Sequence, residues 1–165
     1  MRLDRATVHF LFQNYEGTIN RRTWRTGTLV LAAILIPLTI VWLIVAPATR
    51  RDLSTRGFLD AEALAAFIFL MIFAFAVILI AVSWTNLSAK RFRALGRPPA
   101  LAAALPLAAL LAGAAHWFQP RAPDIFPDWG LILVEVALTA IAAWSFYELG
   151  LANPRPRRRS NQPRG

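Results

Sequence analysis

The chain has 165 residues, of which 57% are apolar and only 16% carry a charge, and it contains no cysteine. Lys and Arg number 18 against 9 Asp and Glu, which gives a formal net charge of +9. Soluble domains carry a charge on about a quarter of their residues, so this chain lacks the means to build a solvated surface. The composition excludes a disordered chain and a disulfide scaffold, and it excludes thiol chemistry. A membrane protein is the class that remains.

The first predicted element is a short amphipathic helix over residues 5–16. Val8, Leu11, Phe12 and Tyr15 recur at the spacing of one helical face. Such a helix is expected to lie in the plane of the membrane interface, with its apolar face among the lipid chains. Packing beneath the transmembrane helices is the other interpretation, and the two are compatible.

Four apolar stretches follow, each close to the ~20 residues that a helix needs to cross a bilayer. They cover residues 27–46, 63–84, 98–118 and 129–149. Ten residues of the third stretch are Ala or Gly, a composition that either allows close helix packing or is simple filler. The sequence therefore predicts an all-α fold, an integral membrane bundle of four transmembrane helices. It forms a single membrane domain over residues 1–152, followed by a disordered basic tail over residues 153–165.

The distribution of Lys and Arg predicts the orientation in the membrane. Residues 1–26, 85–97 and 150–165 carry fourteen of the basic side chains, whereas the other two connecting segments carry four. Because cytoplasmic loops are enriched in Lys and Arg, we expect both termini on the cytoplasmic side of a bacterial inner membrane.

This orientation gathers basic side chains at the cytoplasmic ends of the first three spans. They are predicted to contact anionic phospholipid headgroups or a protein partner, and setting the topology or neutralising helix ends is the alternative. A membrane-protein partner or a homo-oligomer is compatible with the Ala-rich third span. Nucleic acid is rejected as the main partner, because no readout element or stacking platform accompanies the basic tail. The basic residues at the cytoplasmic ends of the first three spans are Arg21, Arg22, Arg25, Lys90, Arg91, Arg93 and Arg97.

Glu135 is the one ionisable side chain well inside a predicted span. Such residues are costly in lipid and usually face other helices or a functional path. His116, at the end of the third span, is placed on the same side of the membrane and could approach it. A protonated carboxyl bonded to a neighbouring helix is the structural interpretation. A small transporter or transporter subunit that uses Glu135 is the alternative function.

The residues needed for catalysis are not arranged in any recognisable pattern. The sequence has no Gly-rich phosphate loop, no metal-ligand cluster and no base at motif spacing from a serine. We therefore predict a non-catalytic protein with no cofactor and no metal site.

Two short segments and the order of basic segments and spans resemble a bacterial inner-membrane family, domain of unknown function 805. Residues 17–24 (GTINRRTW) are similar to its Gly-Arg…Arg…aromatic-Trp signature before the first span. Residues 90–100 (KRFRALGRPPA) are similar to its loop after the second span, although Arg93-Ala94 stands where the family has His-Asp. The resemblance implies a small multi-span membrane protein and assigns no activity.

Overall fold

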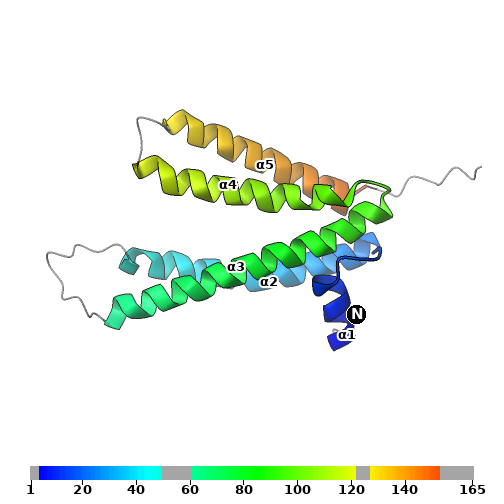
Figure 1. The fold of residues 1–165 in the computed structure, drawn as a ribbon, viewed down its shortest axis with the longest axis horizontal. Helices are drawn as coiled ribbons and strands as arrows, with labels where there is room; N and C mark the ends of the chain where they lie inside the picture. The colour runs from blue at the N-terminus through cyan, green and yellow to red at the C-terminus, as the bar shows by residue number, and fades with distance from the viewer. Residues whose placement is uncertain (1–3, 50–60, 122–126, 153–165) are drawn as a thin grey trace, which may run out of the picture. The chain divides into compact units, whose positions relative to one another are not determined.

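The computed structural model describes residues 4–49, 61–121 and 127–152, and the regular elements in these ranges are all helical (Figure 1). Four of these helical segments are long and apolar enough to cross a membrane. The predicted all-α class and the four spans are therefore confirmed. These segments are α2 (Arg21–Val45), α3 (Ala61–Ala94), the helical stretch Pro99–Arg121 that contains α4 (Ala104–Phe118), and α5 (Asp128–Gly150).

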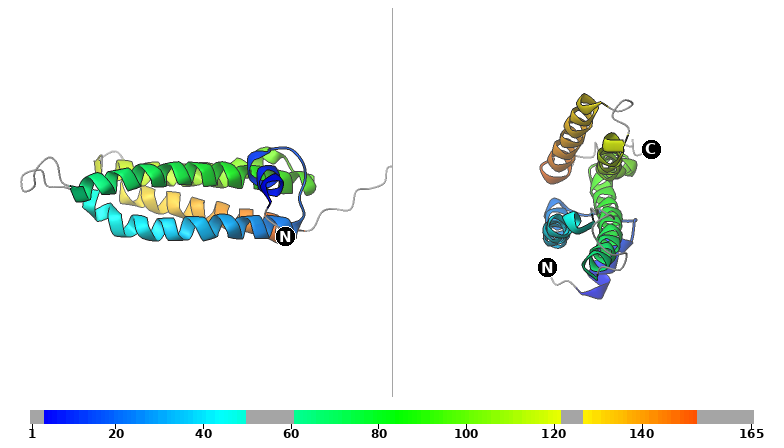
Figure 2. Two further views of the ribbon diagram at one scale, coloured as in Figure 1. Left: turned by 90° about the horizontal axis from the view of Figure 1, so that it is seen from below. Right: turned by 90° about the vertical axis from the view of Figure 1, so that its left-hand side faces the viewer.

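The chain divides into two compact units. The first consists of Met1–Tyr15 and Arg25–Leu87, and the second of Glu16–Trp24 and Ser88–Gly165. The first unit holds the N-terminal helix and most of the antiparallel pair α2 and α3, whereas the second holds the antiparallel pair α4 and α5 together with the first residues of α2 and the last residues of α3 (Figures 1 and 2). The single domain over residues 1–152 stays a prediction, and the predicted disordered tail lies outside the described residues.

The N-terminal helix is present but is shorter and less regular than expected. It consists of α1 (Arg5–Val8), followed by one π-helical segment, η1 (His9–Gln13), after which Asn14 is extended. The Asp4 carboxylate caps α1 by accepting from the Thr7 backbone N–H at 2.9 Å. Hydrogen bonds from Thr7, that of its side chain foremost, hold the pKa of Asp4 below its usual value. Because the helix ends at Gln13, the predicted apolar stripe does not continue to Tyr15.

In the first unit, α2 and α3 approach closely at one end. A methyl group added to Gly27 would lie 2.9 Å from Cδ2 of Leu87, and the Leu87 side chain is fully buried. Towards the other end, Trp42 stacks on Phe73 with ring centroids 5.8 Å apart. A residue larger than glycine at position 27 would therefore require the Leu87 side chain to shift.

Helix α3 continues ten residues past Trp84, where its predicted span ends. The end of the apolar run predicts where the membrane-embedded part of a helix ends. The helix itself can continue beyond that point if its polar side chains have partners, as it does in α3. It ends in a Schellman turn: Arg97 N–H donates to Phe92 O at 2.9 Å and Gly96 N–H to Arg93 O at 3.0 Å. Gly96 adopts φ +70°, so a glycine is favoured there.

In the second unit, α4 packs against α5. The third predicted span is helical from Pro99 onwards, and it begins with a 3₁₀ segment, η3 (Pro99–Ala103), before α4 starts. Pro106 explains the change of geometry: its ring would clash with the carbonyl of residue 102 in a continuous α-helix. It therefore lies in the first turn of α4, where a proline is tolerated.

Candidate functional site

Arg91 is a buried anchor of the second unit, only 2% exposed. Its Nε donates to the carbonyl oxygen of Leu149 at 3.1 Å, and its Nη2 donates to that of Ala152 at 2.7 Å. Both acceptors lie at the carboxyl end of α5, where carbonyl groups lack partners within the helix. The guanidinium also places positive charge at the negative end of the helix dipole. Arg91 therefore caps α5.

Arg21 supports the same helix end, because its Nη1 lies 3.4 Å from the carbonyl oxygen of Leu151. Arg97 forms an ion pair with Glu148 of the last turn, at 2.9 Å. The Arg97 side chain is 44% exposed, so this pair contributes little stability by itself. The last turn of α5 thus meets three cations from distant parts of the sequence.

Trp24 lies beside this cap and is 2% exposed. Its indole Nε1 donates to the Ser88 hydroxyl at 3.3 Å, and its ring meets Phe146 edge-on with centroids 6.1 Å apart. A methyl group added to Gly150 would lie 3.3 Å from the indole, so α5 approaches this ring closely. Asn20 caps the start of α2 just before Trp24, because its side-chain oxygen accepts from the Thr23 N–H at 2.7 Å.

The seven basic residues that were predicted to contact lipid or a partner occupy different environments. Arg91 and Lys90 are buried, the latter with no exposed surface, and Arg93 is half-buried with Nη1 3.4 Å from the carbonyl oxygen of Gly17. The others are exposed: Arg21, Arg22 and Arg97 in the second unit, and Arg25 in the first. Burial of a charge is costly unless it is hydrogen-bonded. The structure therefore holds Lys90 and Arg91 within the fold, while Arg21, Arg22, Arg25 and Arg97 are accessible from outside, and the predicted contact of these seven residues with lipid or a partner stays a prediction.

Glu135 and His116 are brought together in the second unit. Nε2 of His116 on α4 lies 2.6 Å from Oε1 of Glu135 on α5, and both side chains are about half exposed. A shallow groove of about 570 Å³ runs beside Glu135, and its other polar residue is Thr139. The remaining lining residues are apolar, so the pair lies at the edge of an apolar surface.

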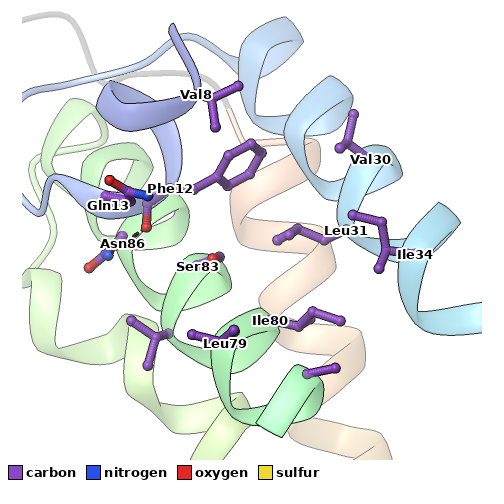
Figure 3. A pocket seen from close by; sticks show the side chains of 12 residues that line it. Val8, Phe12, Gln13, Val30, Leu31, Ile34, Leu79, Ile80, Ser83 and Asn86 are labelled. Carbon is purple, nitrogen blue, oxygen red and sulfur yellow. Dashed lines mark hydrogen bonds between the residues drawn. The ribbon is translucent and has the colours of Figure 1, made fainter. Parts of the chain in front are cut away.

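A second hollow belongs to the first unit, between the N-terminal helix, α2 and α3 (Figure 3). Its volume is about 700 Å³, within the range of small-molecule pockets. The Asn86 side chain donates through Nδ2 to the carbonyl oxygen of Phe12 at 2.8 Å, and this bond attaches η1 to α3. Sequence reasoning missed this hollow. Its one signal was the spacing of Ser83 and Asn86 on a single helical face.

Trp24 precedes the first span, a position at which a tryptophan is usually expected at the membrane interface. The structure buries it, and its partner Ser88 lies 64 residues away. Within residues 4–49, 61–121 and 127–152, no group of three or more His, Asp or Glu side chains is placed to hold a metal ion. Comparison of the chain with protein-family models, with curated proteins and with solved structures found no match.

Proposed function

We propose that this is a non-catalytic multi-pass membrane protein whose exposed basic residues at one end of the second unit bind anionic phospholipid headgroups. The observation that carries the proposal is the difference in solvent exposure among the basic residues. The Arg91 side chain is buried, whereas Arg21, Arg22 and Arg97 are exposed to solvent next to helices that are apolar enough to cross a membrane. Cations at such positions gain about 1 kcal/mol each from anionic lipid.

Replacement of Arg22 and Arg97 by Gln tests this proposal. The protein is reconstituted in vesicles of equal parts phosphatidylglycerol and phosphatidylcholine with the same chains, then extracted, and the retained lipids are quantified. We expect the wild type to be enriched in phosphatidylglycerol, and the enrichment to fall roughly fivefold for each charge removed.

Arg121→Gln is the matched control, because Arg121 is exposed at the opposite end of α4 and its guanidinium lies over the Trp117 ring. It should leave the enrichment unchanged. Equal retention of the two lipids by the wild type, or an unchanged ratio in the double variant, would contradict the proposal.

The proposal includes location in a bacterial inner membrane with both termini in the cytoplasm. It is supported by the excess of Lys and Arg in residues 1–26, 85–97 and 150–165. Membership in the family that residues 17–24 and 90–100 resemble belongs to the same proposal and rests on those motifs. Reporter fusions after Arg56 and after Gly165 test the orientation, and an external carboxyl terminus would refute it.

A second candidate function, a small transporter or transporter subunit, is favoured by the contact between His116 and Glu135. A carboxylate and an imidazole at 2.6 Å can share a proton, which is the simplest cargo such a pair could carry. The Glu135→Gln variant in vesicles loaded with a pH-sensitive dye tests it. If the pair carries protons, the proton flux driven by a pH gradient should fall to that of protein-free vesicles. Equal fluxes in wild type and variant would remove this candidate.

A further inference from the structure

The hollow in the first unit combines a polar end with an apolar interior. Gln13 and Asn86 lie together at one side, and Phe12 lies over the middle (Figure 3). Val30, Leu31 and Ile34 of α2 form the wall opposite α3. A ligand that matches this pocket is amphiphilic, with an apolar chain and a hydrogen-bonding group at one end.

The apolar walls of the pocket continue into the outer surface of α2 and α3. Ile34 is 49% exposed and Leu79 is 63% exposed, and both lie within segments that are apolar enough to cross a membrane. In a bilayer these side chains meet lipid, so the pocket is continuous with the hydrocarbon region and can be filled from it without passage through water. The bilayer is therefore the source of the occupant.

The N-terminal helix carries a positive charge one turn from Val8, a residue that lines the pocket. Arg5 is exposed and precedes Val8, a pocket residue, by one helical turn. The neighbouring carboxylate of Asp4 is occupied with the cap of α1. A cation here complements an anionic headgroup, as expected for a helix that lies in the membrane interface.

We propose that this pocket holds one acyl chain of an anionic phospholipid from the surrounding bilayer. The chain lies between α2 and α3, its ester group is near the amides of Gln13 and Asn86, and its phosphate is near Arg5. The proposal rests on the proposed membrane location, but it concerns a different unit and different residues from the exposed arginines of the second unit.

Filling the pocket tests the proposal. Ala76 lines the pocket, and Ala74 lies on the same helix, exposed and outside the pocket. The full chain is reconstituted in equal parts dioleoyl-phosphatidylglycerol and dioleoyl-phosphatidylcholine, extracted in mild detergent, and weighed by native mass spectrometry. We expect the wild type and Ala74→Phe to retain one phospholipid per chain more than Ala76→Phe, in addition to any lipid held by the second unit.

Two further variants separate the parts of the argument. Ser83→Leu narrows the pocket with a side chain that is smaller than the Phe of Ala76→Phe, and it should also release the lipid. The test therefore does not depend on the folding of a single variant. Arg5→Gln should keep the lipid but lower the preference for phosphatidylglycerol over phosphatidylcholine by roughly fivefold. Folding of each variant is checked by its helical circular dichroism.

The outcomes for this pocket and for the basic residues of the second unit are distinct. Loss of lipid in Ala76→Phe with normal retention in the Arg22/Arg97 double variant supports the pocket. Retention of the lipid by folded Ala76→Phe or Ser83→Leu would overturn it, whatever the double variant does. Equal loss in Ala74→Phe would also overturn it, because the release would then not depend on the pocket.

Discussion

Replacement of Trp24 by Ala is expected to lower the free energy of unfolding by about 3–5 kcal/mol, the range for a buried aromatic side chain truncated to Ala. The indole is 2% exposed, donates to Ser88 and is closely approached by α5 at Gly150. The cavity would therefore open between segments that the ring joins. Reversible unfolding in mixed micelles, followed by circular dichroism, measures the change.

Trp129→Ala is the matched control, because Trp129 is on α5 of the same unit but is 64% exposed. It should change the free energy of unfolding by less than about 1 kcal/mol, as is usual for surface substitutions. Trp24→Phe keeps most of the ring and removes the bond to Ser88, so it should cost about 1 kcal/mol. Equal effects of Trp24→Ala and Trp129→Ala would show that burial does not decide the role of Trp24.

Replacement of Arg91 by Met is expected to destabilise the second unit by about 2–6 kcal/mol. The side chains are similar in length, but Met leaves the carbonyl groups of Leu149 and Ala152 without their donor. Each unsatisfied buried group costs about 1–3 kcal/mol. Unfolding in mixed micelles gives the total, and hydrogen exchange should rise first in the last turn of α5.

Arg91→Lys should recover only part of this loss, because an ammonium group cannot reproduce the planar geometry with which Nε and Nη2 reach two carbonyls. Arg22→Met, at an exposed position, is the control and should have little effect on the stability. If Arg91→Met unfolds at the same point as Arg22→Met, the cap does not contribute to stability.

The number, order and approximate length of the spans could be predicted from the sequence, because a bilayer imposes a length and an apolar composition on any helix that crosses it. The cap at Asn20 and the glycine turn at Gly96 were also accessible, since both depend on neighbouring residues only. Local sequence carries these features.

The roles of Trp24 and Arg91 could not be predicted in this way. A tryptophan or an arginine at the end of a span fits an exposed position at the membrane surface equally well. What buries these two is contact with residues 58 to 64 positions away. Likewise, the pocket of the first unit depends on the bond between Asn86 and Phe12, which are 74 residues apart. No periodicity in either segment specifies such a pairing.

The capping of α5 by Arg91 has a consequence for the order in which the protein assembles. Its two acceptors lie 58 and 61 residues further along the chain, so they are synthesised long after α3. Until then the guanidinium of a nascent chain has water or lipid phosphate as its partner, and it leaves them only when α5 arrives. Docking of α5 is thus coupled to dehydration of Arg91 on α3, and this docking is a late step in biogenesis.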